Sequence, residues 1–218
     1  MAKRQKPADP RAKLIKTAFE AAIRDGWRDV RIAEIAKRAG ITVAEAYKVA
    51  PDRPSLMDAY VEAIDAIALG AFSDDAADGE AWRDAAFDLL MLRFDAMLKD
   101  RDALRVIYFD DGRDLIALAR TARRTRRSIE RVLEASGFAE DALGVRLGAV
   151  AFLPLYARVF RTWLNDEADQ ARTMAALDKA LSRLDGLKGR VSRSSSHGEA
   201  EPGLDEPSNH PPTNGSTH

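Results

Sequence analysis

The sequence predicts an all-α fold in which a small N-terminal three-helix domain precedes a larger helical bundle. Two observations predict it. Apolar residues recur at the spacing of one helix face along most of the chain, and no stretch shows the strict apolar and polar alternation of a half-buried strand. The chain has 218 residues, of which 46% are hydrophobic, so it is long enough to bury a sizeable core.

The first three helices are short and closely spaced. The first is expected from Pro10 to Asp25, with an apolar stripe along one side and a glycine at its end. The second runs from Ile32 to Ala39, and Gly40 then turns the chain. The third is expected from Thr42 to Val49, where the Thr42 hydroxyl can cap the free N–H groups.

Longer helices follow. Asp52 can cap a fourth helix that connects the two domains, and Pro54 is tolerated in its first turn. From Gly189 onward the composition changes to Ser, Gly, Pro, His and Asn, which bury too little surface to offset the entropy lost on ordering. Further helices are expected at about residues 80–99, 101–109, 113–135, 139–164 and 167–187. We therefore divide the chain into a flexible basic arm (1–9), an N-terminal domain (10–53), a helical domain (54–188) and a disordered polar tail (189–218).

Composition argues against several classes of protein. There is no cysteine, and all three histidines (His197, His210 and His218) lie in the tail, so catalysis by these side chains, thiolate metal sites and disulfides are not expected in the folded part, and no cofactor is expected. No apolar run approaches the ~18 residues that span a bilayer, and the basic N-terminus does not resemble a signal peptide. We expect a cytoplasmic protein without stable membrane insertion.

Charge is distributed unevenly. Residues 1–53 contain 13 Lys and Arg against 7 Asp and Glu, while the whole chain has a net charge of −1. A basic small domain joined to an acidic larger one is typical of a protein that meets polyphosphate at one end. Chance scatter of charges along helices is the alternative.

The segment from Ile32 to Tyr47 has the parts of a helix-turn-helix. This motif needs a short helix, a tight turn that a glycine permits, and a second helix whose first side chains reach base edges in the major groove. The sequence supplies them in order, with Gly40 at the turn and the small Ala36 at the helix crossing. It therefore indicates DNA binding.

At these residues the chain resembles the TetR/AcrR family of transcriptional regulators. The resemblance rests on Ile35-Ala36, Ala39-Gly40-Ile41-Thr42, Tyr47, Pro51, Arg53 and Leu56, and it spans about residues 11–60. It implies a homodimer that binds a double-stranded DNA operator through one helix-turn-helix per subunit. It also implies that residues 54–188 form the ligand-binding and dimerisation domain. A repressor modulated by a small apolar ligand is the implied function.

The resemblance also implies which residues contact DNA. Thr42 and Tyr47 would contact phosphates, Lys48 a phosphate or base edge, and Arg53 would fasten the fourth helix to the DNA backbone. Lys3, Arg4 and Lys6 would enter a minor groove or form a solvated end. The implied DNA-binding residues are Arg31, Thr42, Val43, Ala44, Tyr47, Lys48 and Arg53.

The third helix departs from the family pattern. Glu45 and Ala46 replace a small or hydroxyl residue and a leucine, and Val49 and Ala50 replace His-Phe. A buried Phe replaced by Ala leaves a void that costs about 3 to 5 kcal/mol if nothing fills it. Glu45 would face phosphate with the wrong charge unless it pairs with a cytosine amine.

Two sets of residues in the second domain have candidate functions. A soft, aromatic-rich wall can line an apolar pocket, or it can be ordinary core; its members are Met91, Phe94, Met97, Tyr108, Phe152, Tyr156 and Phe160. Small and apolar residues on the last two helices can form the dimer interface, or they can pack within the chain; these are Gly144, Gly148, Met174, Leu177 and Leu181.

Three alternatives remain open. Segments such as Trp163-Leu164-Asn165-Asp166 are similar to the ubiquinone-biosynthesis accessory protein, a TetR-like lipid carrier that does not bind DNA, although the polar, proline-broken tail here does not suit a membrane-binding helix. The arginine-rich run 120–131 can meet an anionic membrane or nucleic acid, or be a solvated face paired with acids. Asp110, Asp111 and Asp114 can hold a hard cation or form a turn and helix cap.

Overall fold

The computed structural model describes residues 9–72 and 81–197, which form helices and contain no strand. The all-α prediction is confirmed. The elements are α1 (Pro10–Asp25), η1 (Trp27–Asp29), α2 (Ile32–Ala39), α3 (Val43–Val49), α4 (Arg53–Ala71), α6 (Trp82–Met97), η2 (Leu98–Asp100), α7 (Arg101–Asp111), α8 (Leu115–Ala135), α9 (Ala142–Leu164) and α10 (Ala171–His197).

The N-terminal helices begin and end at local signals. The Asp9 side chain accepts a hydrogen bond from the Arg11 N–H, and Pro10 occupies the first turn of α1. Gly26 and Gly40 both have positive φ, 90° and 68°, a conformation that side chains with a Cβ rarely adopt. These glycines let α1, α2 and α3 fold back on one another within a short stretch of chain.

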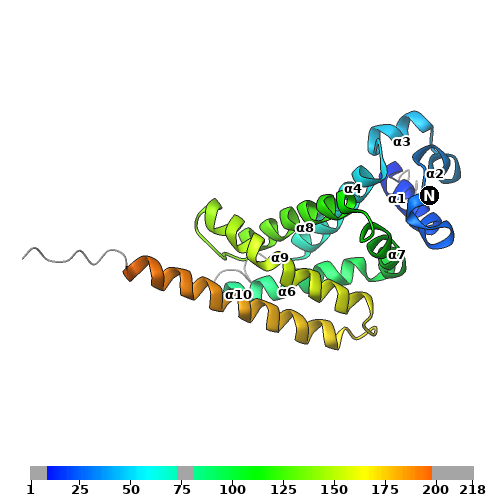
Figure 1. Ribbon diagram of the computed structural model, residues 1–218. Helices are drawn as coiled ribbons and strands as arrows, with labels where there is room; N and C mark the ends of the chain where they lie inside the picture. Colours follow the sequence, from blue (N-terminus) through cyan, green and yellow to red (C-terminus); the bar gives the residue numbers. More distant parts are fainter. Residues whose placement is uncertain (1–8, 73–80, 198–218) are drawn as a thin grey trace, which may run out of the picture.

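The larger domain is a bundle built around α4, α6, α8, α9 and α10. α4 leaves the N-terminal domain and packs on α6 and α8, while α9 lies between α8 and α10. Figure 1 shows α1 to α3 gathered at one end of the molecule and α10 along the far side of the bundle. The largest fully buried side chains of the bundle are Leu89, Leu90, Phe94, Ile129, Leu133, Phe152, Trp163, Leu164 and Leu177.

A buried charge cluster joins four bundle helices to each other. Asp65 of α4 accepts hydrogen bonds from Arg93 Nε of α6 at 2.9 Å and from Ser128 Oγ of α8 at 2.6 Å. Arg131 Nη1 reaches the other carboxylate oxygen at 2.8 Å, and Arg93 also donates to the Tyr156 hydroxyl of α9. Because every oxygen of the buried carboxylate is bonded, the cluster fixes how these helices lie against each other.

The last helix differs from the prediction at both ends. It starts at Ala171, because Asp166 accepts hydrogen bonds from the N–H and hydroxyl of Thr173, and Gln170 has a φ of 55°. It continues to His197, past the boundary expected at Gly189, because extending an established helix costs little per added residue. The rest of the predicted tail and residues 1–8 of the basic arm lie outside the described residues.

α9 is more apolar than expected from the sequence, in which no apolar run near the length of a membrane span was recognised. Among the described residues it is the helix that is long and apolar enough to cross a membrane by length and composition, with a mean hydropathy of 1.4, and 33% of that stretch is buried. It packs along α8 and α10, as a core helix of a bundle does. Its outer side therefore presents apolar surface.

Candidate nucleic-acid interface and ligand-binding core

A reciprocal cap fixes the start of α3. The Thr42 hydroxyl accepts a hydrogen bond from the Glu45 N–H, and the Glu45 carboxylate accepts from the N–H and hydroxyl of Thr42 at 3.0 and 2.7 Å. The hydrogen bond from the Thr42 side chain holds the pKa of Glu45 below its usual value. The carboxylate that seemed to carry the wrong charge for DNA is therefore used to start the helix.

α3 presents polar side chains outward and small ones inward. Ala46 and Ala50 are fully buried against the N-terminal core, whereas Tyr47 is 48% exposed and Lys48 is exposed. Figure 1 shows α3 at the outer end of the molecule, away from α10. Of the other predicted DNA-contacting residues, Arg31, Thr42 and Ala44 are exposed and Val43 is half-buried.

Arg53 is used inside the chain. Its Nη1 donates to the Trp27 carbonyl oxygen at 2.6 Å, and its guanidinium lies 5.9 Å from the centroid of the Trp27 ring. The side chain is half-buried. It thereby fastens the first turn of α4 to η1, whereas the sequence suggested a contact with the DNA backbone.

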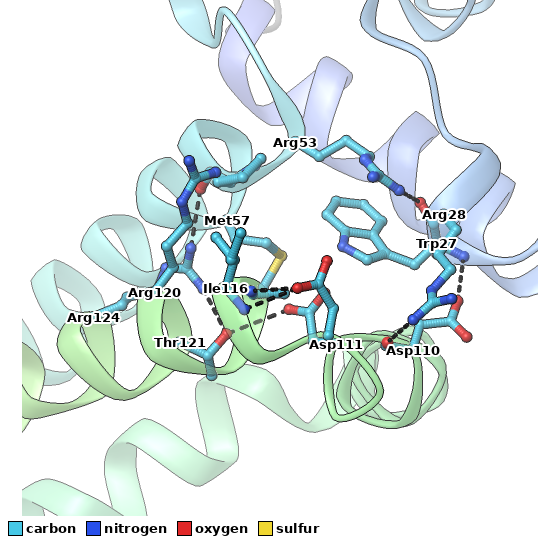
Figure 2. Close-up of a pocket in the computed structure, with 13 residues that line it drawn as sticks. Trp27, Arg28, Arg53, Met57, Asp110, Asp111, Ile116, Arg120, Thr121 and Arg124 are labelled. Carbon is cyan, nitrogen blue, oxygen red and sulfur yellow. Dashed lines mark hydrogen bonds between the residues drawn. The ribbon is translucent and has the colours of Figure 1, made fainter.

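The two domains meet around a small polar cavity of about 130 Å³. Figure 2 shows Arg120 and Arg124 on one side of it and Trp27 and Arg28 on the other. The Trp27 N–H donates to an Asp110 carboxylate oxygen at 2.9 Å, and Arg28 donates to the Asp110 carbonyl. The last turn of α7 therefore holds η1 by both its side chain and its backbone.

α8 adds a second set of contacts at this junction. Arg124 donates to an Asp58 carboxylate oxygen at 2.6 Å and to the Pro54 carbonyl at 3.1 Å. Asp111 is bonded to the Thr121 hydroxyl at 3.3 Å, and its partial burial raises its pKa. The position of the N-terminal domain is thus coupled to α7 and α8.

The predicted ligand residues do lie together in the bundle core. Phe94 stacks on Tyr156 with ring centroids 5.8 Å apart, Tyr156 on Phe160 at 6.3 Å, and Phe160 lies 5.9 Å from Tyr108. Met97 and Phe152 are also buried, and Met91 is half-buried. The rings fill the space between one another, so a ligand would enter by displacing or rotating them.

The predicted dimer residues lie mostly inside the subunit. A Cβ on Gly148 would come within 2.3 Å of the Phe138 ring, and one on Gly144 within 2.8 Å of Ala139. The close approach that these glycines allow is therefore used within the chain. Leu177 and Leu181 are fully buried, and Met174 is exposed.

The exposed side of the same helix pair carries different residues. Leu143, Leu147 and Val150 of α9 are each more than half exposed, and Leu187 of α10 is also exposed. Their spacing of four and three residues along α9 was visible in the sequence. It was missed because two apolar stripes run along this helix and only packing shows which faces inward.

Comparison with known proteins places the fold. No family model and no curated protein matches the chain. Among solved structures, a TetR transcriptional regulator from Nitrosomonas europaea is similar at a TM-score of 0.64 and 22% identity, over 81% of this chain and 99% of that one. The chain has the fold of TetR-family transcriptional regulators.

Other TetR-family structures agree. A regulator from Rhodococcus sp. RHA1 is similar at a TM-score of 0.58 and 20% identity, over 80% of this chain and 95% of that one. The repressor FadR of Thermus thermophilus, in complex with lauroyl-CoA, is similar at 0.55 and 16%, over 80% and 92%. The resemblance predicted from residues 11–60 is confirmed at the level of the TetR-like fold.

The remaining sequence alternatives fare differently. Asp114 caps α8, Asp110 binds η1 and Asp111 binds Thr121, and within the described residues no group of carboxylates or histidines is arranged to hold a metal. The arginine run is partly paired, because Arg124, Arg126 and Arg131 bind acids. The alternative that this protein is a TetR-like lipid carrier is not tested by these observations and stays a prediction.

Proposed function

We propose that this protein is a DNA-binding transcriptional regulator of the TetR type, acting in the cytoplasm and without enzymatic activity. The observation that carries the proposal is the capped α3, which lies at the outer end of the molecule and exposes Tyr47 and Lys48. The basic composition of residues 1–53 supports it. Arg31, Thr42, Val43 and Ala44 complete the contact surface, and Arg53 orients it from behind.

The functional unit is a homodimer formed through α9 and α10. Leu143, Leu147 and Val150 form an apolar stripe on the outer face of α9, and Leu187 and Met174 add to it from α10. A stripe of this kind is covered in a two-fold contact between identical faces. Two α3 helices then read half-sites about one helical turn, ~34 to 36 Å, apart.

The effector is a small apolar molecule that binds among the aromatic rings of the bundle. Phe94, Tyr156 and Phe160 supply flat apolar surface, and the Arg93 guanidinium beside Tyr156 supplies a polar contact at its inner end. The lauroyl-CoA complex of the T. thermophilus repressor supports an apolar ligand class. Ligand entry displaces the rings and releases the repressor from its operator.

Selection of bound sequences from genomic DNA tests the proposal. The full-length protein should enrich one pseudo-palindromic sequence, and Lys48→Ala should weaken binding to it and lower the slope of log affinity against log salt by about 1. Lys179→Ala, which removes an exposed lysine from α10, is the matched control and should leave the slope unchanged. Enrichment of no sequence above background would refute DNA regulation.

A further inference from the structure

The first half of α8 contacts the rest of the chain mainly through Thr121 and Arg124, and its first turn is left exposed. None of residues 115–127 is buried, although the last two turns of the same helix bury Ser128, Ile129, Val132 and Leu133. Leu115 is 84% exposed, Ile116 68% and Leu118 49%. Three of the first four residues of α8 are thus large, exposed aliphatic side chains, which form an apolar tip that water solvates poorly.

The same half-helix is strongly basic. Residues 113–127 contain six arginines and one acidic residue, Asp114, which is occupied in capping the helix. Arg124 and Arg126 are paired with Asp58 and Glu130. Among the described residues, no acid lies within ion-pair distance of the other four, which are Arg113, Arg120, Arg123 and Arg127.

We propose that the outward face of this half-helix, made of Leu115, Ile116 and the four arginines, docks on an anionic lipid surface. An apolar tip inserts at the boundary between headgroups and acyl chains while flanking arginines bind headgroup phosphates, which is how an amphipathic helix lies on a bilayer. The apolar residues of this face thus match the acyl-chain boundary of an anionic bilayer, and its arginines match the headgroup layer.

Neither DNA nor a second copy matches both halves. A DNA backbone would neutralise the arginines but would leave Leu115 and Ile116 in water, since phosphates offer no apolar surface. A two-fold contact through this face would set its arginines against the same arginines of the partner. An anionic lipid surface covers the apolar side chains and also neutralises the arginines.

Vesicle co-sedimentation tests the proposal. The full-length protein should pellet with vesicles of phosphatidylcholine mixed with phosphatidylglycerol and stay in solution with phosphatidylcholine alone. Each of Arg120→Gln and Arg123→Gln should lower the partition coefficient about fivefold, and the double variant Leu115→Ser/Ile116→Ser should abolish pelleting. Ile67→Ser on α4 and Arg183→Gln on α10 remove exposed residues elsewhere and should change nothing.

A site-specific probe separates docking from unfolding or self-association. Because the chain has no cysteine, Leu115→Cys takes a single nitrobenzoxadiazole label, whose emission should shift to the blue on anionic vesicles only, and a label at Ile67→Cys should not shift. Equal pelleting with both vesicle types, or an unshifted label at position 115, would overturn the proposal. The proposal would also be overturned if Leu115→Ser/Ile116→Ser changed the molecular mass measured by sedimentation but kept vesicle binding. That result would identify the face as a contact between copies. Operator binding is measured separately, so this result stands or falls independently of the proposed regulator.

Discussion

Glu45 illustrates how one residue can be misread from a family pattern. Viewed as a substitution in a recognition helix, it places a negative charge where phosphate is expected. In the structure its carboxylate is bonded to Thr42 and neutralises free N–H groups at the start of α3. The side chain therefore adds to the rigidity of the helix without facing outward as a bare charge.

The cap predicts a measurable stability difference at position 42. Thr42→Ala removes the acceptor for the Glu45 N–H and should lower the free energy of unfolding by about 1 kcal/mol. Thr42→Ser keeps a hydroxyl in the same place and should stay near wild type. Urea unfolding followed by circular dichroism measures both, and equal destabilisation by the two variants would argue against the cap.

Asp166 predicts how stability depends on acidity. Burial alone would raise its pKa, but hydrogen bonds from Thr173, Arg172 and the Glu167 N–H outweigh it and lower the pKa to about 2. The ionised carboxylate therefore stabilises the fold above the unfolded-state pKa of 3.8 and loses this effect as the pH falls through about 2.

Denaturant unfolding measures this contribution when it is repeated between pH 5 and pH 2 at intervals of about one pH unit. The wild type should lose up to about 2 kcal/mol from this group across the window. Asp166→Asn should start lower at neutral pH and show a correspondingly flatter profile. A profile as steep as that of wild type would assign the acid sensitivity to other carboxylates.

At the level of helices, the Asp65 cluster decides how α4 is held in the bundle. Asp65→Ala strands the Arg93 guanidinium, which is 6% exposed, and should cost about 3 to 5 kcal/mol. Glu62→Ala removes an exposed acid from the same helix, whose partner Arg11 is also partly exposed, and should cost no more than about 1 kcal/mol. Thermal unfolding compares the two, and similar losses would mean that the cluster contributes little.

The packing of Phe138 on α9 gives a second test at this scale. Gly148→Ala places a methyl group against the Phe138 ring and should destabilise by about 1 to 3 kcal/mol through forced repacking. Gly186→Ala on α10 meets open space and should raise stability by up to about 1 kcal/mol, since alanine favours a helix. Chemical unfolding of both variants checks the opposite signs.

The helices that the sequence predicted well are those with local signals. Gly40 and the caps at Thr42 and Asp52 place α2, α3 and α4 within a residue of expectation, because each signal acts through its own backbone neighbours. Gly148 and Leu181 were candidates either for a dimer interface or for packing within the chain, and the structure buries both within the chain. What fills a groove depends on residues distant in sequence, such as Phe138, and periodicity does not identify them.

For the whole molecule, the junction between the domains is the place where binding at one end can reach the other. Asp110→Ala removes the acceptor for the Trp27 N–H and should speed hydrogen exchange in α1 to α3 relative to the bundle. It should also weaken operator binding with little loss of global stability. Exchange that rises uniformly along the chain would place the effect elsewhere.

α4 connects the Asp65 cluster with the Arg53 contact on Trp27, and it runs between them as one uninterrupted helix. The twelve residues from Asp65 to Arg53 span about 18 Å, so a tilt of about 5° about the buried end would shift the other end by about 1.6 Å. In a symmetric pair the two shifts add to about 3 Å, against a groove repeat of about 34 Å. A rearrangement too small to disturb the core would therefore be enough to move both α3 helices of the proposed dimer out of register with the grooves of the duplex.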